Sequence, residues 1–249
     1  MIRLTVVLTE AFRQPYFCFE RVLMKYRNIT YGKFISRPNR FIAMVEVDGN
    51  TEVCHVKNTG RCRELLIPGV DVILEKSDNP SRKTMYDLIA VYKDGELINI
   101  DSQAPNRVFG EWAAERGFFG ECPSIKPESK YKNSRFDFYI ESEGRKIFTE
   151  VKGVTLEENG VVLFPDAPTE RGVKHVTELI DAVKNGYEAY IFFVIQMKNC
   201  ACFTPNRRTH PEFSDVLIQA KENGVNIQAV NCTVTPDSLE ICDFIEVKL

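Results

Sequence analysis

Histidines and paired cysteines are scarce in this chain, and their scarcity excludes the common zinc-binding modules. Three histidines occur in 249 residues, and none lies at the short spacing of a zinc-ligand pair. The eight cysteines form no C-x-x-C pair, and Cys200 and Cys202 are the closest two. Scattered thiols in a chain of this length, without an export signal, are typical of reduced cytosolic proteins. We therefore expect a cytoplasmic protein without structural disulfides or an iron–sulfur site.

The chain also lacks an excess of positive charge and any long hydrophobic run. Its 32 basic and 35 acidic residues give a net charge of −3, so any contact with nucleic acid must come from local basic patches. The apolar stretch at residues 1–7 is interrupted by Arg3, and we expect no transmembrane segment. No glycine-rich nucleotide-binding loop and no helix-turn-helix with a basic recognition helix stand out.

The order of patterns along the chain predicts an α/β protein of mixed α+β character with two domains, 24–104 and 105–249. Short alternating segments separated by polar turns favour a small all-β domain, with strands at 41–47, 51–56, 70–75, 86–92 and 97–100 and a short helix at 61–66. Helices and strands then alternate, with helices at 105–117, after Thr169 and at 211–224, and strands at 125–130, 189–196 and 225–230. Residues 1–23 are either an extension that contributes little or a short added element.

The stretch from residue 135 to residue 175 contains the main candidate residues for a metal site and for catalysis. Residues 135–140 and 147–152 read as two strands of a hairpin whose turn is centred on residues 143–144. That register places Asp137 directly across from Glu150, with Cβ atoms roughly 5 Å apart. Two like charges at that separation destabilise a sheet unless a cation compensates, and Mg²⁺ takes one or two carboxylates together with water or substrate oxygens.

Lys152 lies two residues beyond Glu150 and therefore on the same face of the strand. Two acids and a lysine on one face are the arrangement for metal-assisted phosphodiester cleavage, in which the metal activates water and the ammonium orients it. Two alternatives stay open. A bulged turn would shift the pairing by one residue and lose the direct contact of Asp137, and an exposed hairpin of alternating charge would carry no chemistry.

Asp137 and the Glu150–Lys152 triplet match the core of the PD-(D/E)xK nuclease-like domain. The surrounding sequence resembles more specifically the sugar fermentation stimulation protein A family. The resemblance extends from residue 24 to about residue 232, and the matching blocks follow in order at residues 58–61, 75–80, 99–106, 133–138 and 164–172. The resemblance implies an OB-fold-like barrel, then a nuclease-like mixed-sheet domain that binds duplex DNA and a divalent metal, Mg²⁺ or Mn²⁺. Whether members cut DNA is not settled by it, and a non-catalytic transcriptional regulator of sugar-utilisation genes is the alternative.

The candidate DNA-binding residues are basic side chains in three places. They are Arg61 and Arg63, Arg82 and Lys83 in two barrel loops, and Arg171 and Lys174 in the first turns of the helix after Thr169. For any one of the loop residues, a solvated charge without a partner is the competing interpretation. A homodimer is left open, and a sugar-metabolising enzyme finds no nucleotide-binding loop to support it.

Further candidates support the carboxylate pair. In nuclease-like domains a helix before the hairpin often offers one more acid to the metal, and Glu111 matches by position, although an ordinary surface glutamate fits equally. Asp166 is expected near the end of the Glu150 strand, as a supporting group or as part of the turn at 165–168. Gln196 is a candidate support on a later strand. His175 as a general base requires a geometry that the sequence does not give.

Overall fold

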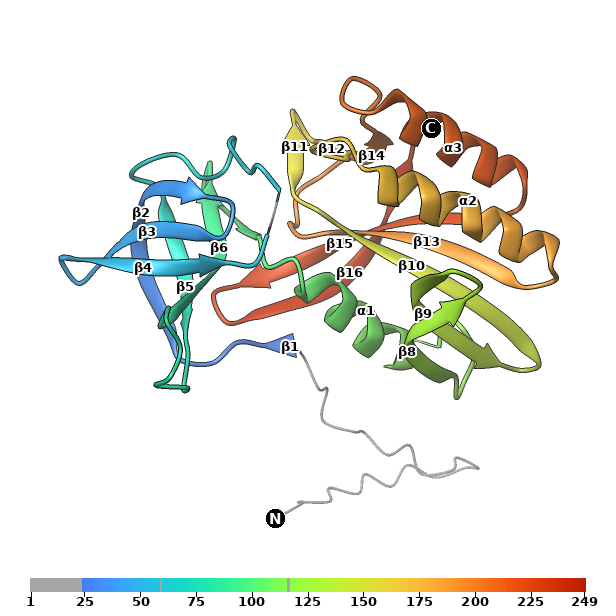
Figure 1. Cartoon of the computed structure of the whole chain (residues 1–249), viewed down its shortest axis with the longest axis horizontal. Coiled ribbons are helices and arrows are strands. Elements are labelled where there is room, and N and C mark those ends of the chain that lie inside the picture. Colours follow the sequence, from blue (N-terminus) through green and yellow to red (C-terminus); the bar gives the residue numbers. More distant parts are fainter. Residues whose placement is uncertain (1–23, 59, 116) are drawn as a thin grey trace, which may run out of the picture.

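The computed structural model describes residues 24–58, 60–115 and 117–249, and the predicted extension at 1–23 lies outside this range. Within it, a barrel formed by the first part of the chain stands beside a larger mixed sheet covered by helices on both faces (Figure 1). None of the described helices is long and apolar enough to span a membrane.

Five strands close into the predicted OB-like barrel, which is confirmed. They are β2 (Ile29–Asn39), β3 (Ile42–Val47), β4 (Asn50–Val56), β5 (Asp71–Lys76) and β6 (Tyr86–Lys93), and β7 (Glu96–Asn99) extends β6 as a hairpin. The strand order is β4-β3-β2-β5-β6, and a parallel pairing of β4 with β6 closes the ring.

Two predictions for the barrel are wrong. Strand β2 is absent from the predicted set. It contains Gly32, which packing requires, since a Cβ at that position would lie 2.5 Å from Cγ1 of Val45. A glycine at that position weakens the apolar alternation by which a strand is identified. The predicted helix at 61–66 is a turn, since Cys62 has a left-handed φ of 45° that a helix does not accommodate.

The second sheet runs in the order β11-β12-β14-β16-β15-β13-β10-β9-β8. Its strands are β8 (Ser124–Tyr131), β9 (Ser134–Ser142), β10 (Arg145–Val154), β11 (Leu156–Glu158), β12 (Val161–Phe164), β13 (Glu188–Ile195), β14 (Cys202–Pro205), β15 (Asn226–Thr235) and β16 (Ser238–Val247). The two residues of β1 (Met24–Lys25) pair with β16, so the described chain starts in the second sheet before it enters the barrel.

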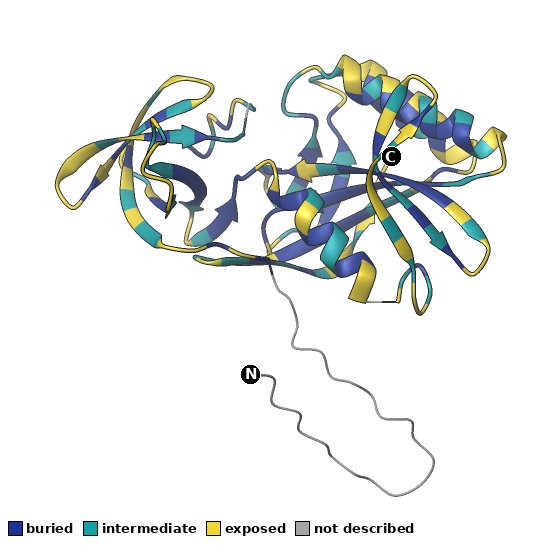
Figure 2. Cartoon of the chain, turned by 60° about the horizontal axis from the view of Figure 1, so that its bottom comes forward, coloured by how far each residue is buried: buried dark blue, intermediate teal, exposed yellow. Residues whose placement is uncertain are grey.

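Three helices cover this sheet: α1 (Ala104–Glu115), α2 (Glu170–Lys184) and α3 (Pro211–Glu222). Helix α1 packs Phe109 and Trp112 into an aromatic cluster with Phe192 of β13. On the other face, α2 and α3 lie next to each other and bury apolar side chains such as Leu179 and Phe213. Figure 2 shows these helices with buried residues toward the sheet and exposed residues on their outer sides.

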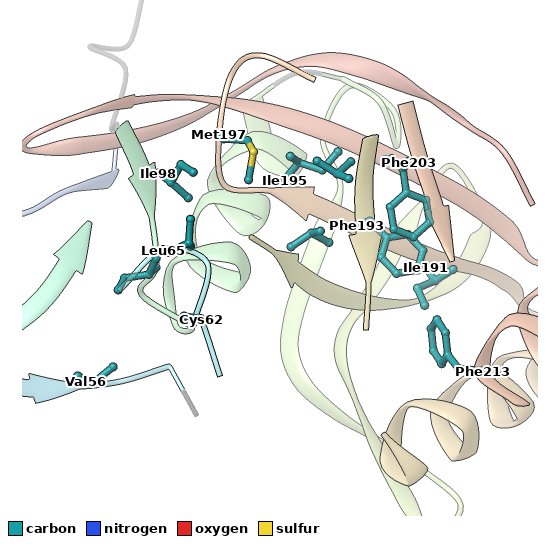
Figure 3. Close-up of a cluster of buried hydrophobic side chains, with 14 of the residues drawn as sticks. Val56, Cys62, Leu65, Ile98, Ile191, Phe193, Ile195, Met197, Phe203 and Phe213 are labelled. Carbon is teal, nitrogen blue, oxygen red and sulfur yellow. The ribbon is translucent and has the colours of Figure 1, made fainter. Parts of the chain in front are cut away.

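A continuous hydrophobic cluster joins the barrel to the second domain. Cys62, Leu65 and Ile98 of the barrel region belong to the same buried cluster as Ile195 and Met197, which lie at the end of β13 and just beyond it (Figure 3). The two domains therefore share apolar surface removed from water, the dominant favourable term in folding. Their shared core fixes the barrel loops near the helices of the second domain.

Candidate metal centre and nucleic-acid groove

The predicted hairpin register is confirmed as far as Phe138 and Thr149. Strands β9 and β10 pair from Ser142–Arg145 to Phe138–Thr149 around a turn with positive φ at Glu143 and Gly144. At the next position the backbone ladder stops, and Oδ2 of Asp137 accepts the backbone N–H of Val151 at 2.8 Å. The side chain of Asp137 thus takes the place of a backbone acceptor beside the strand that carries Glu150.

Both oxygens of Asp137 are held by donors. While Oδ2 is bound by the backbone of β10, Oδ1 accepts a hydrogen bond from Nδ2 of Asn106 in the first turn of α1, at 2.8 Å. The sequence analysis missed this role of Asn106. The available signal was its position at the end of the 99–106 block, but the contact itself depends on how α1 packs against the sheet.

Glu150 is 2 % exposed, and its two oxygens have different surroundings. Oε1 accepts hydrogen bonds from Nζ of Lys152 on the same strand and from Nδ1 of His175 on α2, the second at 2.5 Å. Oε2 is buried and has no hydrogen-bond partner among the described residues. A buried carboxylate oxygen without a donor is costly, which makes this atom a candidate metal ligand.

The two carboxylates interact electrostatically. Burial raises the pKa of Asp137, and the negative charge of Glu150 raises it further. Burial acts in the same direction on Glu150, but the hydrogen bond from His175 and the charge of Lys152 outweigh it and lower the pKa of that carboxyl. Glu150 therefore stays anionic and repels a charge on Asp137. Two carboxylates that repel each other, with Oε2 of Glu150 not used in a hydrogen bond to any described residue, fit a hard divalent cation, which binds oxygen ligands.

Glu111, the predicted additional ligand, forms a salt bridge of 3.3 Å with Arg107 one turn earlier in α1. The residue of α1 that reaches the carboxylate pair is Asn106. The ion pair with Arg107 accounts for Glu111 without a metal, and its role as a further metal ligand stays a prediction.

Asp166 contacts the barrel. Its Oδ2 accepts the backbone N–H of Arg61 at 3.1 Å, and a Cβ on Gly60 would lie 2.5 Å from the same oxygen. Arg37 also binds this loop, donating to the carbonyl oxygens of Asn58, Gly60, Arg61 and Arg40. The exposed side chains of Arg61 and Arg63 are thereby placed beside the turn that leads into α2.

The second basic loop of the barrel carries Arg82, whose charge is paired within the barrel, and Lys83, whose side chain is exposed. The guanidinium of Arg82 makes two hydrogen bonds to the carboxylate of Asp87, at 2.6 and 3.1 Å, and Lys57 lies 3.5 Å from the same carboxylate. The charge of Arg82 is thus largely neutralised within the barrel, whereas Lys83 is exposed.

A groove of about 530 Å³ lies between the turn that joins β8 to β9 and the first turns of α2. It is lined by Asn133, Ser134, Arg135, Glu170, Arg171, Lys174 and His175. Thr169 caps α2 as predicted, its Oγ1 accepting the N–H of Gly172 at 3.1 Å. Three basic side chains face one acidic side chain in this groove, and a helix N-terminus adds favourable dipoles for an anion.

Gln196 lies at the junction of the domains. It is 1 % exposed, and its Nε2 donates to Oδ1 of Asn99 at 2.7 Å and to the carbonyl oxygen of Asp101 at 3.0 Å. A Cβ on Gly153 would lie 2.6 Å from its Oε1, so Gln196 borders β10 one residue beyond Lys152. Its hydrogen bonds fix the segment between the barrel and α1.

A second group of side chains, Glu170, His210 and Glu212, has the distances of a metal site, but its hydrogen bonding argues against one. The N–H of Thr169 donates to Nδ1 of His210 at 3.3 Å, so the neutral ring carries its proton on Nε2, the nitrogen that faces the carboxylates. The two glutamates are 85 % and 65 % exposed and lie in the first turns of α2 and α3, where acids favour the helix dipole.

Comparisons with known proteins cover both domains. Residues 35–100 match a family model described as the SfsA N-terminal OB domain, and residues 103–238 match the sugar fermentation stimulation protein RE domain. A sugar fermentation stimulation protein homolog of Clostridium beijerinckii is 62 % identical over 226 residues, which are 91 % of this chain and 100 % of the relative. A homolog of Desulfitobacterium hafniense is 64 % identical over 91 % of this chain and 99 % of its own length.

A solved structure is similar throughout. Pyrococcus furiosus SfsA, determined in complex with Ca²⁺, superimposes with a TM-score of 0.84 at 28 % sequence identity. The match covers 91 % of this chain and 99 % of the archaeal chain.

Because the carboxylates of Asp137 and Glu150 repel each other, removing one of the two negative charges should stabilise the folded protein. In EDTA at neutral pH, Asp137→Asn should raise the melting temperature, because a raised pKa in the folded state means that ionising Asp137 opposes folding. The gain should disappear as the pH falls below the ordinary pKa of aspartate, where both states carry the proton. Thermal unfolding followed by circular dichroism from pH 3.5 to 7.5 measures it. A variant less stable than the parent at every pH would contradict the repulsion.

Proposed function

Because this chain belongs to the sugar fermentation stimulation protein family, we propose that it binds duplex DNA in the cytoplasm and holds a divalent cation at Asp137 and Glu150. The observation that carries the metal site is the buried Oε2 of Glu150, which no described residue hydrogen-bonds, beside a second carboxylate with a raised pKa. The Ca²⁺ complex of the archaeal relative supports a divalent ion in this family. We further propose that the site hydrolyses phosphodiester bonds with Mg²⁺ or Mn²⁺.

Each residue of the site has a distinct part in this proposal. Asn106 and the backbone of Val151 fix the carboxylate of Asp137, and Glu150 presents Oε2. A bound Mg²⁺ or Mn²⁺ would supply a Lewis acid that polarises the phosphate and lowers the pKa of water. Lys152 bonds Glu150 with only part of its donor capacity, so its ammonium can also donate to water or to a phosphate oxygen on the same face.

The candidate DNA-binding residues lie on two segments that Asp166 connects. Arg61 and Arg63 stand on the barrel loop that Asp166 joins to the second domain, and Arg171 and Lys174 follow Asp166 in the first turns of α2. Side chains of both sets are exposed, as contacts to a phosphate backbone require. With a net charge of −3 for the whole chain, such local clusters must supply the attraction to DNA.

Cleavage is tested with linear, nicked, branched and single-stranded DNA in Mg²⁺, Mn²⁺ or EDTA. We expect metal-dependent cutting by the parent protein, and a rate at least about 100-fold lower for Lys152→Ala, because a donor to the reacting group is lost. Lys146→Ala, an exposed lysine near the other end of β10, is the matched control and should cut at the parental rate. Binding without any cutting would leave a non-catalytic DNA-binding protein, and the catalytic roles would then be withdrawn.

Binding to DNA is tested separately through its salt dependence. Arg171→Ala and Lys174→Ala should each weaken affinity for duplexes of any sequence and reduce the slope of log K against log salt by about one. Lys221→Ala, which removes an exposed charge at the end of α3, should leave both quantities unchanged. Fluorescence anisotropy between 50 and 300 mM salt measures them, and unchanged slopes for the α2 variants would exclude the groove as a phosphate site.

A further inference from the structure

His175 connects the basic groove to the carboxylate pair. It comes from α2, is 5 % exposed, and lines the groove together with Arg171 and Lys174. Its ring reaches Glu150 on β10, 25 residues earlier in the chain, through a hydrogen bond of 2.5 Å. The ring of Phe136 lies against it at 6.2 Å between centroids, nearly perpendicular at 80°, which restricts the orientation of the imidazole.

The hydrogen bonds define which nitrogen carries the proton. Nε of Arg171 donates to Nε2 of His175 at 3.4 Å, so Nε2 acts as an acceptor and has no hydrogen. The proton of the ring then lies on Nδ1, which donates to Oε1 of Glu150. Both ring nitrogens are thus engaged, Nδ1 as the donor to Glu150 and Nε2 as the acceptor from Arg171.

These hydrogen bonds orient the carboxylate of Glu150. Lys152 and His175 donate to the same oxygen, Oε1, from two different elements, and Oε2 receives no hydrogen bond from the part of the chain that the structure describes. Lys152 is a flexible side chain on the same strand as Glu150 and restrains the carboxylate less than a packed ring does. We infer that His175 is a positioning residue that fixes the Glu150 carboxylate with Oε2 turned to the cation. This inference rests on the proposed metal site.

The role differs from that of a general base. A base must offer an unprotonated nitrogen to the nucleophile, and the acceptor nitrogen of His175 is used by Arg171. Residues that orient a metal-binding side chain through a hydrogen bond typically change metal affinity 10- to 100-fold when they are replaced. The effect of His175 should therefore appear in metal affinity without any DNA present.

Two substitutions of similar polarity separate positioning from general structural support. In His175→Asn the amide nitrogen lies where Nδ1 of histidine lies and can still donate to Glu150. In His175→Gln the amide nitrogen lies near the position of Nε2 and loses that bond. Affinity for Mn²⁺ in the absence of DNA is measured by electron paramagnetic resonance of the free ion, with Glu150→Gln as reference and Lys184→Ala, an exposed lysine in the last turn of α2, as control. Circular dichroism confirms that each variant is folded.

We expect His175→Asn to bind Mn²⁺ within about threefold of the parent and His175→Gln to bind about tenfold or more weakly. Parental affinity in both histidine variants, or an equal loss in both, would overturn the positioning role. If the parent binds no Mn²⁺, or if Glu150→Gln binds as well as the parent, the proposed metal site itself fails. If Glu150→Gln loses affinity and His175→Gln does not, only the inference about His175 fails.

Discussion

Two carboxylates come together in a largely buried space, and residues of α1, β10 and α2 hold them there despite the repulsion between them. Charged groups removed from water need compensation, and the interior strengthens both attraction and repulsion. Glu150 is kept ionised by Lys152 and His175, so the cost of a second negative charge falls on Asp137, whose pKa is raised. A cation between the two would convert this repulsion into attraction. Active sites often store such an unfavourable arrangement, which lowers stability in exchange for function.

Three elements distant in the sequence hold this arrangement in place. Helix α1 contributes Asn106, strand β10 contributes a backbone N–H, and helix α2 contributes His175. The barrel is joined to the same scaffold through the apolar cluster around Ile98 and through Gln196, which binds the segment just before α1. Because the barrel loop around Gly60 is in turn bonded to Asp166, the basic loop and the carboxylates belong to one connected framework. A nucleic acid could therefore contact both domains without a large rearrangement.

Local rules predicted the parts of this site that depend on neighbouring residues. The turn at Glu143 and Gly144 sets the register of β9 and β10, and Thr169 caps α2, since turn and cap chemistry act within a few residues. Contacts of Asn106 and His175 were not predicted as such, because they depend on how two helices pack on the sheet. The missed strand β2 has a packing reason as well, since Gly32 fills a position with no room for a side chain.

The most direct test of the account is the position of a cation in the crystal. Crystals soaked in Mn²⁺ and measured near the manganese absorption edge reveal the ion by its anomalous scattering. We predict a peak within coordination distance of Oε2 of Glu150 and of the carboxylate of Asp137. A peak only at the exposed group of Glu170, His210 and Glu212, or no peak at the carboxylate pair, would contradict the assignment of a metal centre to this hairpin.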